Sequence, residues 1–183
     1  MSCDDLPVVV REQRADDYEV IRHVYAEAFR RPGFRRSLDV GSVPPEVGLF
    51  ETLWAAGDVL PELSFTASAE GEVVGHVTAS KATVATDPVV AVGPIGVLSE
   101  HQGVGIGSAL MEALLAAADA AGVPLVVLLG SPRYYARFGF RPATELGVTP
   151  PEREWGDAFQ ARPLTQYTDS IAGPFRYAAA FSS

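Results

Sequence analysis

The chain has 183 residues and a formal net charge of −9; 48% of its residues are hydrophobic and 20% are charged. This length and composition are typical of a globular domain with a substantial core, and they exclude an intrinsically disordered chain. An acidic chain repels nucleic-acid phosphates and anionic membranes, so we expect neither as a partner.

Three features of the sequence bear on its compartment. Cys3 is the only cysteine, which excludes an internal disulfide. Asp4 and Asp5 stand where a secretory signal would carry positive charge ahead of an apolar run. No segment has the roughly 20 consecutive apolar residues of a membrane-spanning helix. The sequence therefore predicts a cytoplasmic protein.

The first part of the sequence predicts a strand and two helices. Residues 7–12 are rich in β-branched side chains, as in a strand. Residues 15–30 place apolar side chains at helical spacing behind acidic residues in the first turn. Residues 31–45 contain several prolines and glycines and predict an irregular connection. A second helix is predicted over residues 46–56, ending at Gly57.

Three strands are predicted next. Residues 63–69 and 73–80 flank a Glu-Gly-Glu turn and predict a β-hairpin. Residues 89–97 predict another strand, with Gly93 and Pro94 inside it. Because proline cannot donate a hydrogen bond to a neighbouring strand, this strand must bulge, bend or lose a neighbour there.

The remaining elements complete a mixed α/β pattern. They are predicted, in chain order, as a helix, a fully buried strand, a short helix and two strand candidates: residues 104–121, 125–129, 133–138, 159–164 and 175–181. No internal repeat, low-complexity tract or linker divides the chain. The pattern therefore predicts a single domain over residues 1–183.

A glycine-rich segment joins the strand at residues 89–97 to the helix that follows it. Gly103, Gly105 and Gly107 alternate there. Backbone N–H groups at a helix start have no intrahelical partner, and the helix dipole adds positive potential at the same place. The segment therefore predicts a site for a phosphate or pyrophosphate.

Three classes of phosphate ligand use such loops, and two of them match poorly. A P-loop requires a lysine directly after its last glycine, but Lys81 is the only lysine in the chain. The dinucleotide fingerprint Gly-x-Gly-x-x-Gly would need glycine where the chain has Ser108, and an acid on a second strand. The available acids, Glu112 and Asp119, lie within the predicted helix. An NAD-binding domain would predict hydride chemistry and no affinity for acetyl-CoA.

The third class fits two sequence landmarks. Residues 102–107, Gln-Gly-Val-Gly-Ile-Gly, match the Gln/Arg-x-x-Gly-x-Gly/Ala signature, so the chain resembles the GNAT superfamily of acyl-CoA-dependent N-acetyltransferases. Residues 134–140, Tyr-Tyr-Ala-Arg-Phe-Gly-Phe, resemble the family's Phe/Tyr-Tyr-x-Lys/Arg-x-Gly-Phe, at the family's spacing. The resemblance is clear over residues 8–145 and looser over residues 146–183.

The resemblance implies both a fold and an activity. The fold would be a mixed α/β sheet with a splayed central strand pair and helices on both faces. The C-terminal residues 146–183 would complete the sheet, or form a lid or a dimer contact. The activity would be direct transfer of an acetyl group from acetyl-CoA to a primary amine of a small molecule or peptide, without a metal. A homodimer is a further expectation.

The resemblance also implies which residues bind the coenzyme. In such proteins the loop amides hold the pyrophosphate, and the pantetheine arm pairs with the preceding strand like an added strand. Backbone N–H groups near Val97 would stabilise the developing oxyanion. The implied coenzyme-binding residues are Ile95, Val97, Gln102, Gly103, Val104, Gly105, Ile106, Gly107, Ser108 and Arg137.

Tyr135 is the implied general acid, because its phenol would protonate the departing thiolate of coenzyme A. His76 and Glu62 are candidate bases. Each also has a structural interpretation, His76 as a hydrogen-bonded strand residue and Glu62 as a cap or edge residue. The alternative function is a non-catalytic acyl-CoA-binding sensor or interaction module, which keeps the glycine loop but does not need Tyr135.

Overall fold

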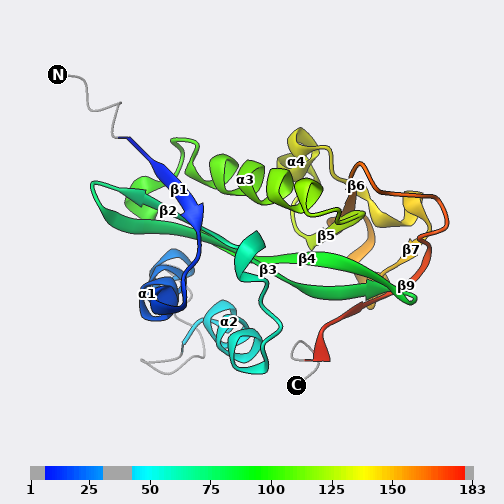
Figure 1. Ribbon diagram of the computed structural model, residues 1–183, viewed down its shortest axis with the longest axis horizontal. Helices are drawn as coiled ribbons and strands as arrows, with labels where there is room; N and C mark the ends of the chain where they lie inside the picture. Colours follow the sequence, from blue (N-terminus) through cyan, green and yellow to red (C-terminus); the bar gives the residue numbers. More distant parts are fainter. Residues whose placement is uncertain (1–6, 31–42, 180–183) are drawn as a thin grey trace.

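The computed structural model describes residues 7–30 and 43–179. Figure 1 shows a twisted sheet with α1 and α2 on one face and α3 and α4 on the other. This arrangement confirms the expected mixed α/β fold with helices on both faces. No helix in the two described segments is long and apolar enough to cross a membrane.

The described chain contains α-helices, strands and short 3-10 helices. The α-helices are α1 (Tyr18–Ala28), α2 (Pro45–Ala56), α3 (Ile106–Ala120) and α4 (Pro132–Tyr135). The strands are β1 (Val9–Glu12), β2 (Phe65–Ala69), β3 (Glu72–Val84), β4 (Asp87–Val97), β5 (Leu125–Leu129), β6 (Arg141–Pro142), β7 (Val148–Thr149), β8 (Phe159–Pro163) and β9 (Gly173–Tyr177). The 3-10 helices are η1 (Ala15–Asp17), η2 (Pro61–Leu63), η3 (Ser99–His101), η4 (Ala136–Phe138), η5 (Ala143–Leu146) and η6 (Arg153–Ala158).

The strands form one mixed sheet in the order β1-β2-β3-β4-β5-β8-β6. Strands β4 and β5 are parallel, and the other neighbours in this order are antiparallel. The long strand β3 pairs on one edge with β4 and on the other with β2 and then β9. Strands β8 and β9, from the C-terminal part of the chain, therefore join the sheet through β5 and β3.

Strand β4 changes its pairing at Gly93 and Pro94. Ile95 pairs with Val77 on β3, and Val92 pairs with Ala79. Two residues of β4 therefore lie between these pairs where β3 has one, so β4 carries one extra residue there. Gly93 has a φ of 142°, which favours glycine. Pairing with β5 ends at Val92, directly before this bulge. The sequence prediction that the strand would bulge, bend or lose a neighbour at this point is confirmed, since the strand both bulges and loses β5.

One hairpin is missing from the sequence prediction. Strand β3 continues to Val84 and β4 begins at Asp87, with Ala85 and Thr86 as the turn. Ala85 has a φ of 51° in the left-handed region, where hairpin turns usually carry glycine or asparagine. Because the turn contains neither glycine nor asparagine, the sequence does not show the usual pattern of a hairpin here.

Two helices of the structure also differ from the sequence prediction at their ends. The helix predicted over 104–121 begins only at Ile106, because Gly105 takes a left-handed conformation with a φ of 92°. The single helix predicted over 133–138 is α4 followed by η4. Most of the predicted connection at 31–45, and the end of the predicted strand at 175–181, lie outside the described residues.

The core lies on both faces of the sheet. Helix α3 buries its apolar side against β2, β3 and β4, with Leu110, Met111 and Leu114 fully enclosed. On the other face α1 and α2 bury Ile21, Tyr25, Val47 and Phe50. Each fully buried side chain of this size contributes roughly 1.5–3 kcal/mol to stability.

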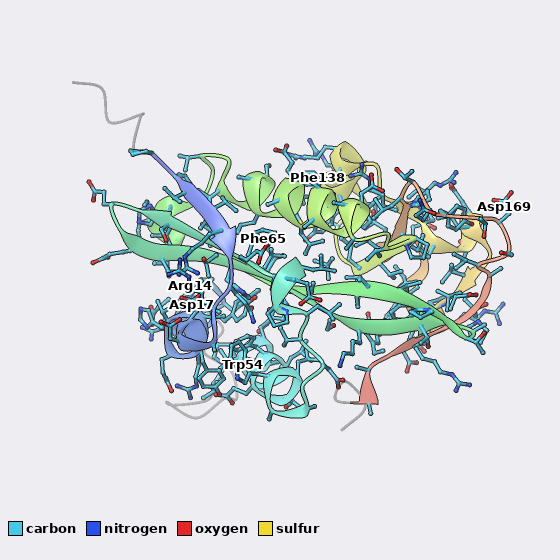
Figure 2. All side chains as sticks on the ribbon, viewed as in Figure 1. Arg14, Asp17, Trp54, Phe65, Phe138 and Asp169 are labelled. Atoms are coloured by element: carbon cyan, nitrogen blue, oxygen red, sulfur yellow. The ribbon has the colours of Figure 1, made fainter. Side chains whose placement is uncertain are left out.

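A polar contact anchors the start of α1 to the edge of the sheet. Asp17, labelled with Arg14 in Figure 2, accepts hydrogen bonds from Arg11 Nη1 at 2.7 Å and Nη2 at 2.8 Å. It also accepts one from the Arg14 backbone N–H at 2.7 Å. The Arg11 guanidinium holds the pKa of Asp17 below its usual value, so the carboxylate stays charged at neutral pH. This contact fixes β1 relative to the first turn of α1.

Helix α1 approaches β4 most closely at Gly96. A Cβ atom on Gly96 would lie 3.0 Å from Tyr25 Cδ1, 3.1 Å from Ala28 Cβ and 3.3 Å from Phe29 Cε2. Any side chain there would push α1 away from the sheet, so glycine at this position sets the distance between the two elements.

The substitution Gly96→Ala should lower the free energy of unfolding by roughly 1–2 kcal/mol, because α1 must shift to admit the methyl group. Urea unfolding followed by circular dichroism measures this. Gly48→Ala in α2 is the matched control, since nothing lies within 4 Å of its Cβ position. Alanine in a helix interior should raise stability there by roughly 0.5–1 kcal/mol. Equal losses in both variants would contradict the close contact at Gly96.

Candidate active site

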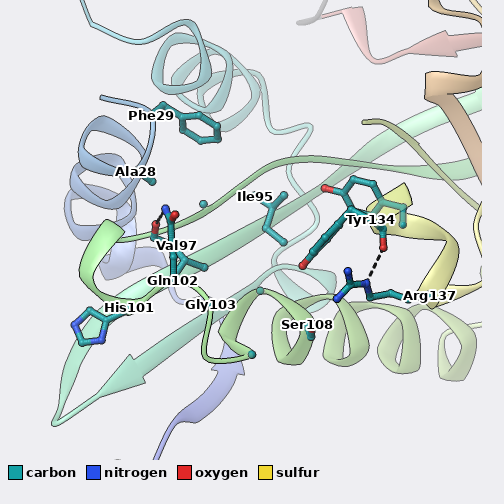
Figure 3. Close-up of a pocket in the computed structure, with 14 residues that line it drawn as sticks. Ala28, Phe29, Ile95, Val97, His101, Gln102, Gly103, Ser108, Tyr134 and Arg137 are labelled. Atoms are coloured by element: carbon teal, nitrogen blue, oxygen red, sulfur yellow. Dashed lines mark hydrogen bonds between the residues drawn. The ribbon is translucent and has the colours of Figure 1, made fainter. Parts of the chain in front are cut away.

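A cleft of about 410 Å³ opens where β4 leaves β5. Figure 3 shows Ala28 and Phe29 of α1 at one end, Tyr134 and Arg137 at the other, and Ile95 between them. The lining residues come from α1, β4, the glycine loop, α3 and α4: Ala28, Phe29, Ile95, Gly96, Val97, His101, Gln102, Gly103, Gly105, Gly107, Ser108, Tyr134, Tyr135 and Arg137. Segments far apart in the sequence therefore meet at this one opening.

The glycine loop delivers the N-terminus of α3 to the cleft. The first helical hydrogen bond runs from Ala109 N–H to the Gly105 carbonyl at 3.0 Å, so the N–H groups of residues 106–108 have no partner within the helix. No side chain caps this end. Gly103 and Gly105 both have positive φ, with values of 78° and 92°. The result is a turn of free N–H donors at the positive end of a 15-residue helix.

Strand β4 presents an unpaired edge to the cleft. Leu98 N–H donates to the Val74 carbonyl on β3 at 2.8 Å. In an antiparallel ladder alternate residues point to opposite edges, so the N–H and C=O groups of Ile95 and Val97 point away from β3. No described strand pairs with β4 on that side beyond Val92. An extended ligand could therefore hydrogen-bond to Ile95 and Val97 as an added strand.

Gln102 fastens the loop to the end of β4. Its Nε2 donates to the Val97 carbonyl oxygen at 2.8 Å. This bond occupies one acceptor of the open edge and leaves the Val97 N–H facing the cleft. It also fixes where the glycine loop begins, so the loop's N–H groups lie in line with the strand edge.

Two tyrosines of α4 form the opposite wall. Their rings meet edge to face with centroids 4.9 Å apart. The hydroxyl of Tyr134 lies over the start of α3, because a Cβ on Gly107 would be 3.2 Å from it. Arg137 Nε donates to the Tyr134 carbonyl at 2.9 Å, and its guanidinium carbon lies 4.5 Å from the Tyr134 ring centroid. Tyr134 and Arg137 thus stand at the phosphate end of the cleft.

Tyr135 stands against the end of β5. A Cβ on Gly130 would lie only 2.4 Å from Tyr135 Cε2, so this glycine makes room for the ring. Gly130 is held by its N–H, which donates to the Ala158 carbonyl at 2.9 Å, and by Gln160 Nε2, which donates to its carbonyl at 3.1 Å. Burial raises the pKa of Tyr135 to about 12, with a smaller contribution from Tyr134. The phenol is therefore protonated at neutral pH.

The structure brings together most of the residues that the resemblance implied. Nine of them line the cleft: Ile95, Val97, Gln102, Gly103, Gly105, Gly107, Ser108, Tyr135 and Arg137. Two others do not present their side chains to it. Val104 is 72% exposed at the tip of the loop, and Ile106 is packed in the core beneath α3. Only their backbone groups are available to a ligand.

Neither candidate base lines the cleft. His76 is fully buried in β3, with Nδ1 2.6 Å from the Tyr25 hydroxyl and Nε2 2.9 Å from Gln13 Oε1. Burial lowers the pKa of His76 to about 3, so it is neutral at physiological pH. Glu62 is exposed in η2, on the stretch that leads into β2. The structure thus places His76 as a hydrogen-bonded strand residue and Glu62 in a surface turn.

Five lining residues were not among the predicted site residues: Ala28, Phe29, Gly96, His101 and Tyr134. His101 directly precedes the first sequence landmark and Tyr134 begins the second, so the landmarks themselves indicated that these residues lie near the site. Ala28 and Phe29 reach the cleft only because α1 packs on β4 at Gly96. That contact joins residues about 70 positions apart, and no local pattern indicates it.

The charge of the cleft is opposite to that of the chain. Its lining contains Arg137 and His101, and none of the described residues that line it is Asp or Glu. Among the same described residues, no group of three or more His, Cys, Asp or Glu is placed to hold a metal ion. The local field therefore favours an anionic ligand even though the net charge of the whole chain is −9.

Known proteins resemble this chain in sequence and in fold. The model of the acetyltransferase (GNAT) family matches residues 21–140. The uncharacterized N-acetyltransferase YjhQ of Escherichia coli strain K12 is 29% identical over 170 residues, which cover 88% of this chain and 87% of that protein.

Two solved structures are similar over nearly the whole chain. The GNAT family N-acetyltransferase YhbS from Escherichia coli, in complex with CoA, has a TM-score of 0.83 at 23% identity, covering 100% of this chain and 96% of that one. A GNAT family acetyltransferase from Brucella melitensis, in complex with acetyl-CoA, has a TM-score of 0.74 at 29% identity, covering 97% and 99%. With the family model matching most of its length, the chain belongs to the GNAT family of acetyltransferases.

Proposed function

We propose that this protein transfers an acetyl group from acetyl-CoA to a primary amine of a small molecule or peptide by direct attack. One observation carries the proposal. The open edge of β4 runs from the N-terminus of α3 to Tyr135, within a single cleft. The similar structure from Brucella melitensis, which holds acetyl-CoA, supports the choice of donor.

The donor would lie along this edge in one orientation. Its pyrophosphate would accept hydrogen bonds from the N–H groups at residues 106–108, with Arg137 nearby. The pantetheine arm would pair with the backbone of Ile95 and Val97 in place of a strand. With the pyrophosphate and the pantetheine arm placed in this way, the thioester lies where β4 leaves β5, beside Tyr135.

The reaction has two requirements that the cleft can meet. As the amine attacks, negative charge develops on the thioester oxygen, and the outward-facing N–H of Ile95, at the end of the edge nearest the β4 bulge, is a donor to it. As the C–S bond breaks, the thiolate accepts a proton, and Tyr135 is the donor. Its raised pKa keeps the phenol protonated, so Tyr135 acts mainly through a hydrogen bond that strengthens in the transition state.

The acceptor amine would lose its proton to water before the attack. Neither His76 nor Glu62 reaches the cleft, and no described carboxylate lines it. An amine enters the reaction only in its neutral form, so solvent must take its proton ahead of the chemical step.

The proposal is tested by calorimetry and by a turnover assay. Acetyl-CoA should bind, whereas NAD should not. Consumption of the thioester is then followed across a panel of amines, peptides and aminoglycosides. Turnover with at least one amine supports the transferase, and binding without turnover across the panel favours the acyl-CoA-binding module. NAD binding without acetyl-CoA binding would overturn both.

The substitution Gly107→Val should weaken acetyl-CoA binding at least about tenfold, which is about 1.4 kcal/mol. Gly107 lines the cleft in the first turn of α3, and a side chain there would stand where the pyrophosphate approaches. Calorimetry gives the dissociation constant. Gly48→Val, the same change in α2 with nothing within 4 Å of the Cβ, is the control and should bind as the wild type does. Unchanged binding by Gly107→Val would place the pyrophosphate elsewhere.

The substitution Tyr135→Phe should lower kcat by about 10²-fold while the dissociation constant of acetyl-CoA stays within about twofold. The ring remains and only the proton donor is lost. The rate is measured with the most reactive amine of the panel. Tyr167→Phe is the control, because that ring packs in the cluster at the far half of the sheet. A Tyr135→Phe enzyme with wild-type kcat would remove the proposed acid.

The substitution Gly130→Ala should lower kcat about as much as Tyr135→Phe does, because the new methyl group would displace the Tyr135 ring. The double variant tests the cause. If Gly130 acts through Tyr135, adding Gly130→Ala to Tyr135→Phe should cost little further kcat. Fully multiplicative losses would show that Gly130 affects the rate by another route.

A further inference from the structure

A buried polar cluster lies directly behind the bulge of β4. The Tyr25 hydroxyl is 2.6 Å from His76 Nδ1 and 2.8 Å from Thr78 Oγ1, and it donates to the Pro94 carbonyl oxygen at 2.8 Å. Tyr25, His76 and Thr78 are all fully buried. Because the single hydroxyl proton goes to Pro94, the Tyr25 oxygen accepts a hydrogen bond from Nδ1–H of the neutral His76 ring. His76 Nε2 is then an acceptor, and the Gln13 amide, whose buried Nε2 otherwise has no partner, donates to it when its oxygen and nitrogen are exchanged. The cluster therefore holds the hydroxyl in one orientation.

The acceptor of this bond belongs to the peptide group that joins Pro94 to Ile95. In a trans peptide the C=O and N–H groups point in opposite directions. The only cis bond among the described residues is the preceding one, Gly93–Pro94. The bond from Tyr25 therefore holds one end of this peptide group, and the Ile95 N–H at its other end points away from β3, to the side where β5 no longer pairs. Ile95 lines the cleft on that side.

The sheet supports this peptide from one side only. At the bulge β4 has an extra residue relative to β3, so the regular register is interrupted there, and β5 pairs only as far as Val92. The bond from Tyr25 is therefore an additional support for the Pro94–Ile95 peptide. The Tyr25 ring is itself fixed, since it packs against Gly96 so closely that a Cβ there would be 3.0 Å from Cδ1.

We propose that Tyr25 is a positioning residue for acetyl transfer: its hydroxyl fixes the Pro94–Ile95 peptide so that the Ile95 N–H points at the thioester carbonyl. The inference rests on the proposed function, because it takes acetyl-CoA as the ligand of the cleft. Tyr25 touches neither substrate and acts only through this peptide group. His76, at 2.6 Å, serves to orient the Tyr25 hydroxyl.

Infrared difference spectroscopy of bound [1-¹³C]acetyl-CoA tests this directly, because a hydrogen bond to the thioester oxygen lowers the carbonyl stretching frequency. The wild type should show a lowered band relative to free acetyl-CoA. In Tyr25→Phe, which keeps the ring against Gly96, most of that downshift should disappear. The kcat should fall about tenfold while the dissociation constant of acetyl-CoA stays unchanged.

Two controls separate positioning from general destabilisation. Thr78→Val removes a hydroxyl from the same buried cluster but leaves the Tyr25–Pro94 bond, so its band should match the wild type even if its melting temperature falls. Tyr18→Phe makes the same chemical change in the same helix, where the ring packs on Phe50 and Trp54. It should leave both the band and kcat unchanged.

The outcomes are distinguishable. A wild type that does not bind acetyl-CoA overturns the proposed function, and this inference with it. Binding with an unshifted carbonyl, or an equal downshift in Tyr25→Phe, overturns the inference alone, as does an equal loss in Thr78→Val. Should Tyr25→Phe not fold, Ile95→Pro removes the N–H itself, which is not part of the β3 ladder. An unchanged band in Ile95→Pro then overturns the inference, because it shows that the Ile95 N–H is not the donor to the thioester.

Discussion

Beyond Val92, strand β4 pairs with a described strand on one edge only, which is the edge next to β3. The candidate site depends on the other edge, which is left open. Gly93 and Pro94 add a residue that β3 cannot match, while β5 turns away at Gly130 toward α4. An exposed strand edge is usually a liability, since it can pair with any extended chain. Here the glycine loop continues the open edge and α4 forms the wall that faces it, so the edge favours one kind of ligand.

The chemistry of the cleft comes mainly from the backbone. The N–H groups of Ile95, Val97 and the first turn of α3 are the donors, and glycine at several positions keeps side chains from covering them. Backbone dipoles do not titrate, which explains how a chain of net charge −9 can present an anion site whose described lining has no carboxylate. Apart from Tyr135, the proposed proton donor, and Arg137, the side chains serve mainly to hold this backbone in place, as Gln102 does at Val97.

Sequence reasoning recovered the parts of the site that local rules determine. The glycine loop, the strand before it and Tyr135 lie within about 45 residues, and each carries a helix, bulge or motif signal of its own. His76 could not be placed in the same way, because its environment is set by Tyr25 and Gln13, which lie 51 and 63 positions away. A histidine in a strand has the same sequence signature whether its ring faces a cleft or a packed helix. The hairpin at Ala85 was missed for a related reason, since its left-handed residue is not glycine.

The two ends of the cleft are built by different means, and this bears on what each end can recognise. At the loop end the donors are backbone groups, which would bind any pyrophosphate in the same way whatever the rest of the molecule is. At the other end Ala28 and Phe29 are side chains of α1, and they reach β4 only because position 96 is glycine. Changes in α1 can therefore alter this end of the cleft while the backbone donors of the glycine loop stay the same. The same helix also carries Tyr25, so the support of the β4 bulge and the acceptor wall are coupled through one rigid element.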